Sequence, residues 1–180
     1  MKILNVLIII VLLGNISLKA QNGVNNFYEK ENTIYWQKIY KTDLNKKAII
    51  NAFKESGIFS TIIIDNNKLT GTVSNFKNNY KLAGYNGWQT PIFISDSYVQ
   101  CYAIIDIKEN RYRVTLKNIN FKRKFDPAES EVEECYPIED YALKNQTKIK
   151  SSFQKLSSKI LNFTFTNKFQ IKKQMLSFNW

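Results

Sequence analysis

The middle of the chain alternates apolar and polar residues with the two-residue period of a half-buried β-strand. Between Ser97 and Ile107, one face of the predicted strand collects Val99, Cys101, Ala103, Ile105 and Ile107. Between Arg111 and Lys117, the corresponding face collects Tyr112, Val114 and Leu116. The short polar segment 108–110 separates the two runs, so we expect an antiparallel hairpin with one buried face.

A strand and a helix are expected before this hairpin. Ile34 to Lys41 is rich in Ile, Tyr and Trp and predicts a strand. The next segment repeats apolar residues on one helical face. We expect Thr42 or Asp43 to cap the start of this helix, and Gly57 to follow its end.

A second hairpin is expected between this helix and the central strands. The β-prone runs Phe59–Asp65 and Lys68–Phe76 are separated by two asparagines, which tolerate the left-handed backbone of tight turns. Residues 77–96 contain two glycines and a proline and predict a long loop, in which Ile92–Ile94 is expected to form a brief strand.

A second helix is predicted to begin at Asp140, since apolar residues then recur at helical spacing. The apolar stripe consists of Ile149, Phe153, Leu156 and Ile160. A separate face is expected to carry Lys144, Lys148, Lys155 and Lys159. The tail that follows is basic and has no clear period.

The order strand, helix, four strands, helix predicts an α+β fold, an antiparallel sheet with both helices packed on one face. We expect a signal peptide at 1–20, a flexible leader at 21–33, one domain at 34–163 and a basic tail at 164–180. A chain of this length is large enough for one domain with a substantial core.

The first twenty residues have the layout of a cleavable secretory signal. Lys2 precedes an apolar run from Val6 to Leu13, and Ala20 suits the position before the cut. The run is shorter than a membrane-spanning helix requires. We expect export to the periplasm or the medium and no transmembrane segment in the mature chain; a retained N-terminal anchor helix is the alternative.

The charge of the chain favours anionic partners. Removing the two lysines of the first twenty residues lowers the formal net charge from +11 to +9. Seven acidic residues gather between Asp126 and Asp140, whereas Tyr141 to Trp180 has eight lysines and no acid. This asymmetry fits a binding surface, and ordinary solvated segments explain it equally well.

Cys101 and Cys135 are the only cysteines. An exported chain meets an oxidising compartment, so we expect one disulfide between them, which would draw the acidic loop over the sheet. Two free thiols, one of them buried in a strand, are the alternative.

The chain has no histidine, which removes the usual general base and most zinc sites. Neither nucleotide-binding glycine pattern is present. We therefore predict no catalytic residue, no metal site and no cofactor. A hydrolase that uses carboxylates of the acidic loop at 126–140 is the alternative, because carboxylate pairs are not recognisable from sequence alone.

The segments that carry a family resemblance are ENTIYWQKIYKTDLNKKAIINAF, NKLTGTVSNF and KENRYRVTLKNINF. They resemble a family of secreted bacterial envelope proteins with a domain of unknown function and a TATA-binding-protein-like fold. The resemblance implies the half-repeat of that fold, which runs strand, helix, four strands, helix. It implies no catalytic residues. A fold alone does not assign function, and export argues against genomic nucleic acid as the partner.

The function predicted from these features is a non-catalytic binding or assembly module of the envelope. If Tyr112 and its alternate neighbours face the helices, then Arg111, Arg113 and Lys117 lie on the open face of the sheet, with Tyr102 on the next strand. Cations and an aromatic ring suit an anionic or sugar-like partner. Ordinary solvated positions are the alternative. Because Ile119 and Phe121 share the parity of the basic residues, the strand must bulge, twist or end near Asn118.

Overall fold

The computed structural model describes residues 23–123 and 134–172, and its longest strands are the two that alternation predicts. Strand β6 spans Tyr98–Lys108, and strand β7 spans Arg111–Arg123, paired antiparallel with it. Every odd-numbered residue of β6 from Val99 to Ile107 is buried. The predicted central hairpin is confirmed.

The irregularity expected near Asn118 is also confirmed. Gln100 of β6 is opposite Asn120, but Tyr102 is opposite Lys117, so β7 contains one extra residue between these pairs. Asn118 has a φ of 49°, a left-handed conformation that asparagine tolerates. This β-bulge changes which alternate residues of the strand face the core. The even-numbered Leu116 before it and the odd-numbered Ile119 after it are both fully buried.

The sheet follows the order β1-β2-β3-β7-β6-β5-β4, and β8 pairs with the far end of β7. All of these pairings are antiparallel. The other strands are β1 (Gly23–Val24), β2 (Phe27–Lys30), β3 (Thr33–Lys41), β4 (Ile63–Asp65), β5 (Lys68–Lys77) and β8 (Glu134–Pro137). The predicted hairpin around the two asparagines is β4–β5, shorter on its first side than expected.

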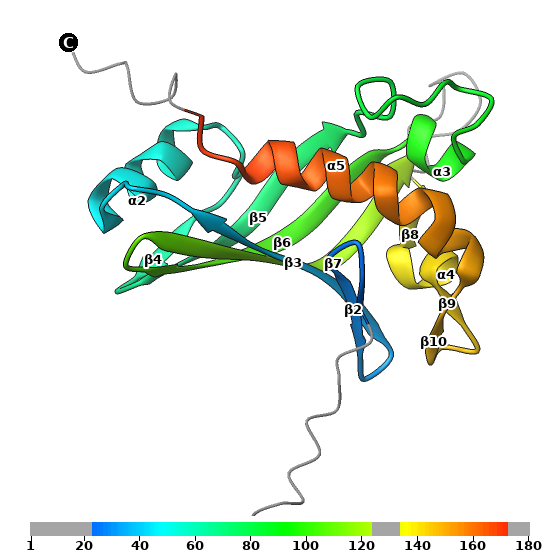
Figure 1. Ribbon diagram of the computed structural model, residues 1–180, viewed down its shortest axis with the longest axis horizontal. Coiled ribbons are helices and arrows are strands. Elements are labelled where there is room, and N and C mark those ends of the chain that lie inside the picture. The colour runs from blue at the N-terminus through cyan, green and yellow to red at the C-terminus, as the bar shows by residue number, and fades with distance from the viewer. Residues whose placement is uncertain (1–22, 124–133, 173–180) are drawn as a thin grey trace, which may run out of the picture.

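The last helix is the longest, and it crosses the sheet (Figure 1). They are α2 (Lys46–Glu55), α3 (Ile92–Ser95), α4 (Ile138–Ala142), the π-helical turn η1 (Phe153–Ser157) and α5 (Ser158–Phe169). A small hairpin, β9 (Leu143–Lys144) with β10 (Lys148–Ile149), lies between α4 and η1. None of the helices in the two described ranges is long and apolar enough to cross a bilayer.

Tyr112 shows that α2 and α5 cover the same face of the sheet. Its ring meets Phe53 of α2 edge-on at 5.5 Å between centroids. Its hydroxyl donates a hydrogen bond of 2.9 Å to the carbonyl oxygen of Phe169, the last residue of α5. One side chain of β7 therefore contacts both helices, and the α+β fold with an antiparallel sheet is confirmed.

The core is built mainly from aromatic rings that the sheet and α5 share. Phe165 of α5 lies 5.6 Å from Trp36, 6.0 Å from Phe27 and 6.1 Å from Phe76, measured between ring centroids. All but Phe76, which is 8% exposed, are fully buried. Edge-on and tilted arrangements of this kind stabilise aromatic cores beyond the area they bury.

The prediction of a flexible leader is wrong for residues 23–33. β2 pairs with β3, and Phe27 is fully buried in the core. The Asn25 and Asn26 amides donate to Ser158 and Asn162 at the helical end of the chain. The segment shows no period because it consists of very short strands joined by turns, whose residues have positive φ: Asn25, Asn26, Glu31 and Asn32.

The boundaries of the second helix also differ from the prediction. Asn145 and Gln146 form a left-handed turn after α4 that interrupts the predicted helix, and Ile149 lies in β10. The helical segment then continues past the predicted domain end at 163, through Thr164 and Phe169. Because Thr164, Phe165 and Phe169 are buried, residues 164–169 belong to the domain and not to a tail.

Two local predictions need correction. The side chain of Asn45, not Thr42 or Asp43, caps α2 by accepting a hydrogen bond from the Ala48 amide at 2.9 Å. Ile92–Ile94 lies in the helical turn α3 instead of a strand. Gly57 does follow the helix with a positive φ of 64°, as predicted.

Replacing Phe165 with Ala should destabilise the domain strongly, because it removes a ring that contacts three others. We expect the free energy of unfolding to fall by about 3 to 5 kcal/mol. Phe163→Ala is the matched control, since Phe163 is on the same helix and only partly buried, and should cost less than about 1.5 kcal/mol. Urea denaturation measures both. A loss of stability in Phe165→Ala as small as that in Phe163→Ala would place residues after 163 outside the cooperative core.

The stability of the fold should fall in alkaline solution. Burial raises the pKa of Tyr112 to about 12 and raises the pKa of Tyr40 well above its usual value. A phenol in the unfolded chain ionises near pH 10, so folding favours the protonated forms. The contribution of Tyr112 is complete below about pH 10 and is lost as the pH rises through about 12, and the contribution of Tyr40 also declines above about pH 10.

Urea denaturation between about pH 8 and pH 12 measures this loss. Tyr112→Phe removes one of the two phenols, so its free energy of unfolding should decline less steeply with pH than that of the parent. Parallel profiles for the two proteins would contradict the role of Tyr112.

Candidate functional site

The side of the sheet opposite α2 and α5, called the open face below, carries the residues that the alternation assigned to it. Arg111, Arg113 and Lys117 of β7 are exposed, and Tyr102 of β6 is half-buried. Among the described elements, no helix lies over this face (Figure 1). The structure therefore brings the four predicted binding residues to one surface.

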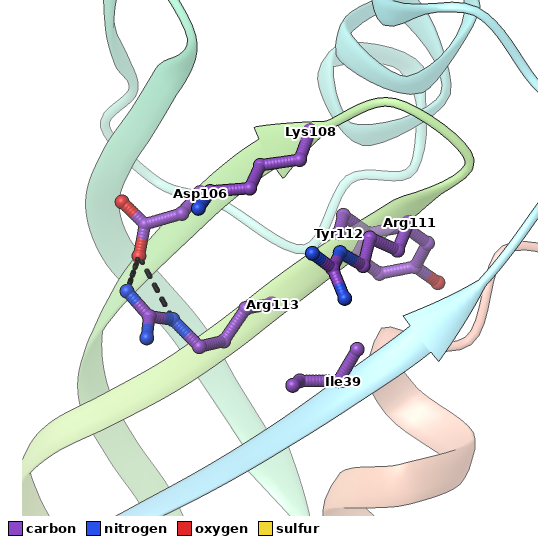
Figure 2. Close-up of a pocket in the computed structure, with 6 residues that line it drawn as sticks. All are labelled: Ile39, Asp106, Lys108, Arg111, Tyr112 and Arg113. Carbon is purple, nitrogen blue, oxygen red and sulfur yellow. Dashed lines mark hydrogen bonds and ion pairs between the residues drawn. The ribbon is translucent and has the colours of Figure 1, made fainter.

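Arg113 is already engaged by an acidic side chain. Its Nε and Nη2 donate hydrogen bonds of 3.2 and 2.9 Å to Oδ2 of Asp106, its neighbour on β6. Figure 2 shows Arg113 turned toward Asp106 with these two bonds. The pair is partly exposed and contributes at most about 1 kcal/mol to stability, but it leaves Arg113 less available to an external anion.

Arg111 lies in a more positive environment than Arg113. The strand register places it directly opposite Lys41 of β3 and Lys108 of β6. All three side chains are exposed, and within the described ranges no acidic side chain forms an ion pair with any of them. We call Lys41, Arg111 and Lys108 the cation row.

A small hollow of about 160 Å³ lies beside the cation row (Figure 2). Its lining residues are Ile39, Asp106, Lys108, Arg111, Tyr112 and Arg113. Ile39 is the register partner of Arg113 and is 57% exposed, which gives the hollow an apolar wall beside its charged groups. The hollow can therefore hold an anionic group together with a less polar ring or chain.

A wider hollow of about 630 Å³ continues over the same face and shares Asp106 and Arg113 with the smaller one. Tyr35, Lys68 and Lys117 are among the residues that line it. Burial is the main cause that raises the pKa of Tyr35, so its hydroxyl stays neutral and can exchange hydrogen bonds. The open face thus combines charge, hydroxyl groups and an aromatic ring.

The sequence analysis did not identify Lys41, Lys108 and Ile39 as parts of this site. Alternation along β7 assigns a residue to a face, but it does not say which residues of β3 and β6 stand opposite. That information is in the register of the strands, which the turns and the bulge determine. The signal available in the sequence was that Lys41 and Lys108 alternate with the core-facing residues of their own strands, which assigns them to the open face.

The predicted disulfide between Cys101 and Cys135 is wrong. Both cysteines are free: Cys101 is buried on β6, and Cys135 is exposed on β8. These strands lie on either side of β7, so their backbones are about 9 to 10 Å apart. A disulfide needs Cα atoms within about 7 Å.

The described part of the acidic segment shows no opposed carboxylates. Glu139 accepts a hydrogen bond of 2.8 Å from the backbone amide of Ile34, so it joins α4 to β3. Glu134 accepts a hydrogen bond from the hydroxyl of Tyr136. The other candidate acids, Glu129, Glu131 and Glu133, lie outside the described residues. Within the described ranges, no three metal-binding side chains come together.

Comparisons with known proteins give a likeness of fold only. No family model matches the chain, and no curated protein matches it. A TBP-like protein from Parabacteroides distasonis ATCC 8503 is similar with a TM-score of 0.48 and 14% identity, covering 82% of this chain and 93% of that one. A DUF4468 family protein from Bacteroides ovatus ATCC 8483 has a TM-score of 0.49 and 13% identity, covering 88% and 94%.

The two neighbours are described as a TBP-like protein and a member of a domain-of-unknown-function family, which are the two terms of the predicted resemblance. The part of the resemblance that concerns secretion stays a prediction. The neighbours carry no information about what the present chain binds. Its α+β fold class is established by its own sheet and helices.

The two thiols should differ sharply in reactivity. Cys101 is buried, and burial raises the pKa of its thiol well above the usual value, so little reactive thiolate forms. Cys135 is exposed. With an aromatic disulfide reagent near pH 8, we expect one thiol per chain to react quickly and the second only after denaturation. Protein that yields no thiol after denaturation without reductant would contradict the free cysteines.

Proposed function

We propose that this chain is an exported, non-catalytic binding module that holds an anionic or sugar-like component of the bacterial envelope on the open face of its sheet. The N-terminal sequence supports export. The observation that carries the binding role is the cation row, in which Lys41, Arg111 and Lys108 stand side by side on three adjacent strands.

Energetics support a ligand at the cation row. Like charges directly opposite each other in an antiparallel sheet destabilise it by about 0.2 to 1 kcal/mol per pair. The next row shows the ordinary solution, because Arg113 is paired there with Asp106. An anion bound between Lys41, Arg111 and Lys108 would remove the repulsion, and the Arg111 guanidinium can bind a carboxylate or phosphate with two parallel hydrogen bonds.

The surroundings of the cation row support a sugar-bearing anion over a bare ion. Ile39 is an apolar surface next to Arg111, and the wider hollow continues to Tyr35 and Gln37. Aromatic rings and aliphatic side chains pack against the flat faces of sugar rings, while amide and hydroxyl groups bind sugar hydroxyls. The open face is long enough for several residues of a polymer.

The carboxylate hydrolase stays an untested alternative. The described acids Glu134 and Glu139 have structural hydrogen-bond partners, and nothing at their positions favours catalysis. An assembly role would use the same open face for a protein partner with acidic groups.

Lys108→Glu tests the binding proposal, because it puts a carboxylate opposite Arg111. We expect the Kd for polygalacturonate, measured by isothermal titration at low salt, to rise about tenfold. The free energy of unfolding should rise by about 0.5 kcal/mol, since a like-charge pair becomes an attractive one. Loss of binding together with gain of stability separates a lost ligand site from a damaged fold.

Lys159→Glu is the matched control, because Lys159 is exposed on α5 and its change alters the net charge equally. It should leave the Kd within about twofold of the parent. Neutral dextran has sugar rings but no charge, so its binding to the parent separates recognition of the sugar from recognition of the charge. Equal polygalacturonate binding by Lys108→Glu and the parent would refute the site, and an equal loss in Lys159→Glu would reduce the effect to net charge.

A further inference from the structure

The segment between β5 and β6 exposes large apolar side chains. Trp88 is 100% exposed, Leu82 71% and Ile92 69%. Single exposed apolar residues are common, but three such residues in one connecting segment, one of them a fully exposed tryptophan, are unfavourable in water. In Figure 1 the segment loops out near α3, at the end of the molecule away from α2.

The exposure of Trp88 is not the result of a loosely held loop. The Gln89 amide donates to Oδ1 of Asn86 at 3.0 Å, and the Asn86 amide donates to Oε1 of Gln89 at 3.4 Å. The Thr90 hydroxyl donates to the Asn86 carbonyl oxygen at 2.8 Å. These reciprocal bonds enclose Trp88 in a turn and hold its backbone in place, so little order is lost on binding.

The same segment is attached to the core. Tyr80, Tyr85 and Phe93 are partly buried against it. The Asn79 amide donates to the Thr164 hydroxyl of α5 at 3.0 Å. The segment therefore turns some apolar side chains inward and presents others outward on a rigid base.

Charge indicates what these outward side chains meet. The segment 78–97 contains Lys81 and Asp96, and Lys77 directly precedes it. The carboxylate of Asp96 is paired with Nε of Arg123 at 3.1 Å, which offsets its charge. Lys81 is exposed directly before Leu82. Tryptophan, aliphatic residues and lysine on a projecting loop are the combination by which proteins enter the interface of an anionic bilayer.

A lipid surface fits this segment better than a glycan does. A projecting loop inserts into a yielding interface, whereas small-molecule and glycan sites are concave. Leu82 and Ile92 have no ring or hydrogen-bonding group with which to recognise a sugar. Trp88 favours the headgroup level of a membrane, and the aliphatic side chains favour the acyl boundary.

We propose that the β5–β6 segment is a peripheral membrane anchor, in which Trp88, Leu82 and Ile92 enter an anionic bilayer and Lys77 and Lys81 contact its headgroups. This surface is distinct from the open-face site. The segment ends at the start of β6, and Lys108 is at the other end of that strand, about 34 Å away for eleven residues.

Vesicle sedimentation tests the anchor with the chain from Gln21, which keeps every described residue and lacks the apolar run Val6 to Leu13. The vesicles are phosphatidylcholine alone or mixed with phosphatidylglycerol. We expect the parent to bind the mixed vesicles, and Trp88→Ser to lower the partition coefficient about tenfold. Because Trp88 is wholly exposed, this variant should fold as the parent does.

Ile63→Ser is the matched control, since Ile63 is 66% exposed on the edge strand β4. It should change partitioning less than about twofold. Lys81→Glu should weaken binding to the mixed vesicles but not to phosphatidylcholine alone. Equal partitioning of Trp88→Ser and the parent, or an equal loss in Ile63→Ser, would overturn the proposal.

Fluorescence quenching gives an independent readout. In a Trp180→Phe background, the remaining tryptophans are Trp88 and the fully buried Trp36. Brominated lipids should quench the emission of Trp88, and the Trp88→Phe variant of this background should show almost no quenching. Self-association without lipid that depends on Trp88, seen by sedimentation velocity, would assign the segment to a second copy of the chain and refute the lipid surface.

Discussion

The single extra residue of β7 at Asn118 organises both faces of the sheet. β7 pairs with β3 and β6 along its first half and with β6 and β8 along its second. Without the bulge, the alternation that buries Tyr112 and Leu116 would turn Ile119 and Phe121 toward solvent. The left-handed Asn118 shifts the parity, so one strand contributes to the core along its whole length while Arg111, Arg113 and Lys117 stay on the open face.

The elements with a sustained period were predictable from sequence. The β6–β7 hairpin, α2 with Gly57 after it, and even the irregularity at Asn118 follow from residue parity and from the backbone preferences of Gly and Asn. Segments too short to repeat a pattern several times were not predictable. β2 has four residues between left-handed turns, so its buried Phe27 could not be distinguished from an isolated aromatic residue of a leader.

The prediction that the domain ends at residue 163 was wrong for a different reason. Residues 164–169 mix polar, apolar and basic side chains without a clear pattern, and the strong apolar stripe ends at Ile160. The burial of Phe165 and Phe169 depends on Trp36 and Phe27, which are distant in sequence. The same dependence on long-range partners limits how much of the site can be predicted from sequence. Arg111 and Arg113 are equivalent by alternation. Only the strand register places Asp106 opposite Arg113, and two lysines opposite Arg111.

The two proposed surfaces occupy opposite ends of β6, and the sheet between them is the most continuous part of the fold. Hydrogen-bonded strands and an aromatic core make this connection stiff, so the surfaces cannot move together to hold one ligand. A module of this shape therefore suits two partners at once, with a bilayer at the β5–β6 segment and an anionic polymer near the β6–β7 turn. Each contact would then raise the effective concentration of the other, so two individually weak sites would hold the chain at an envelope surface more tightly than either alone.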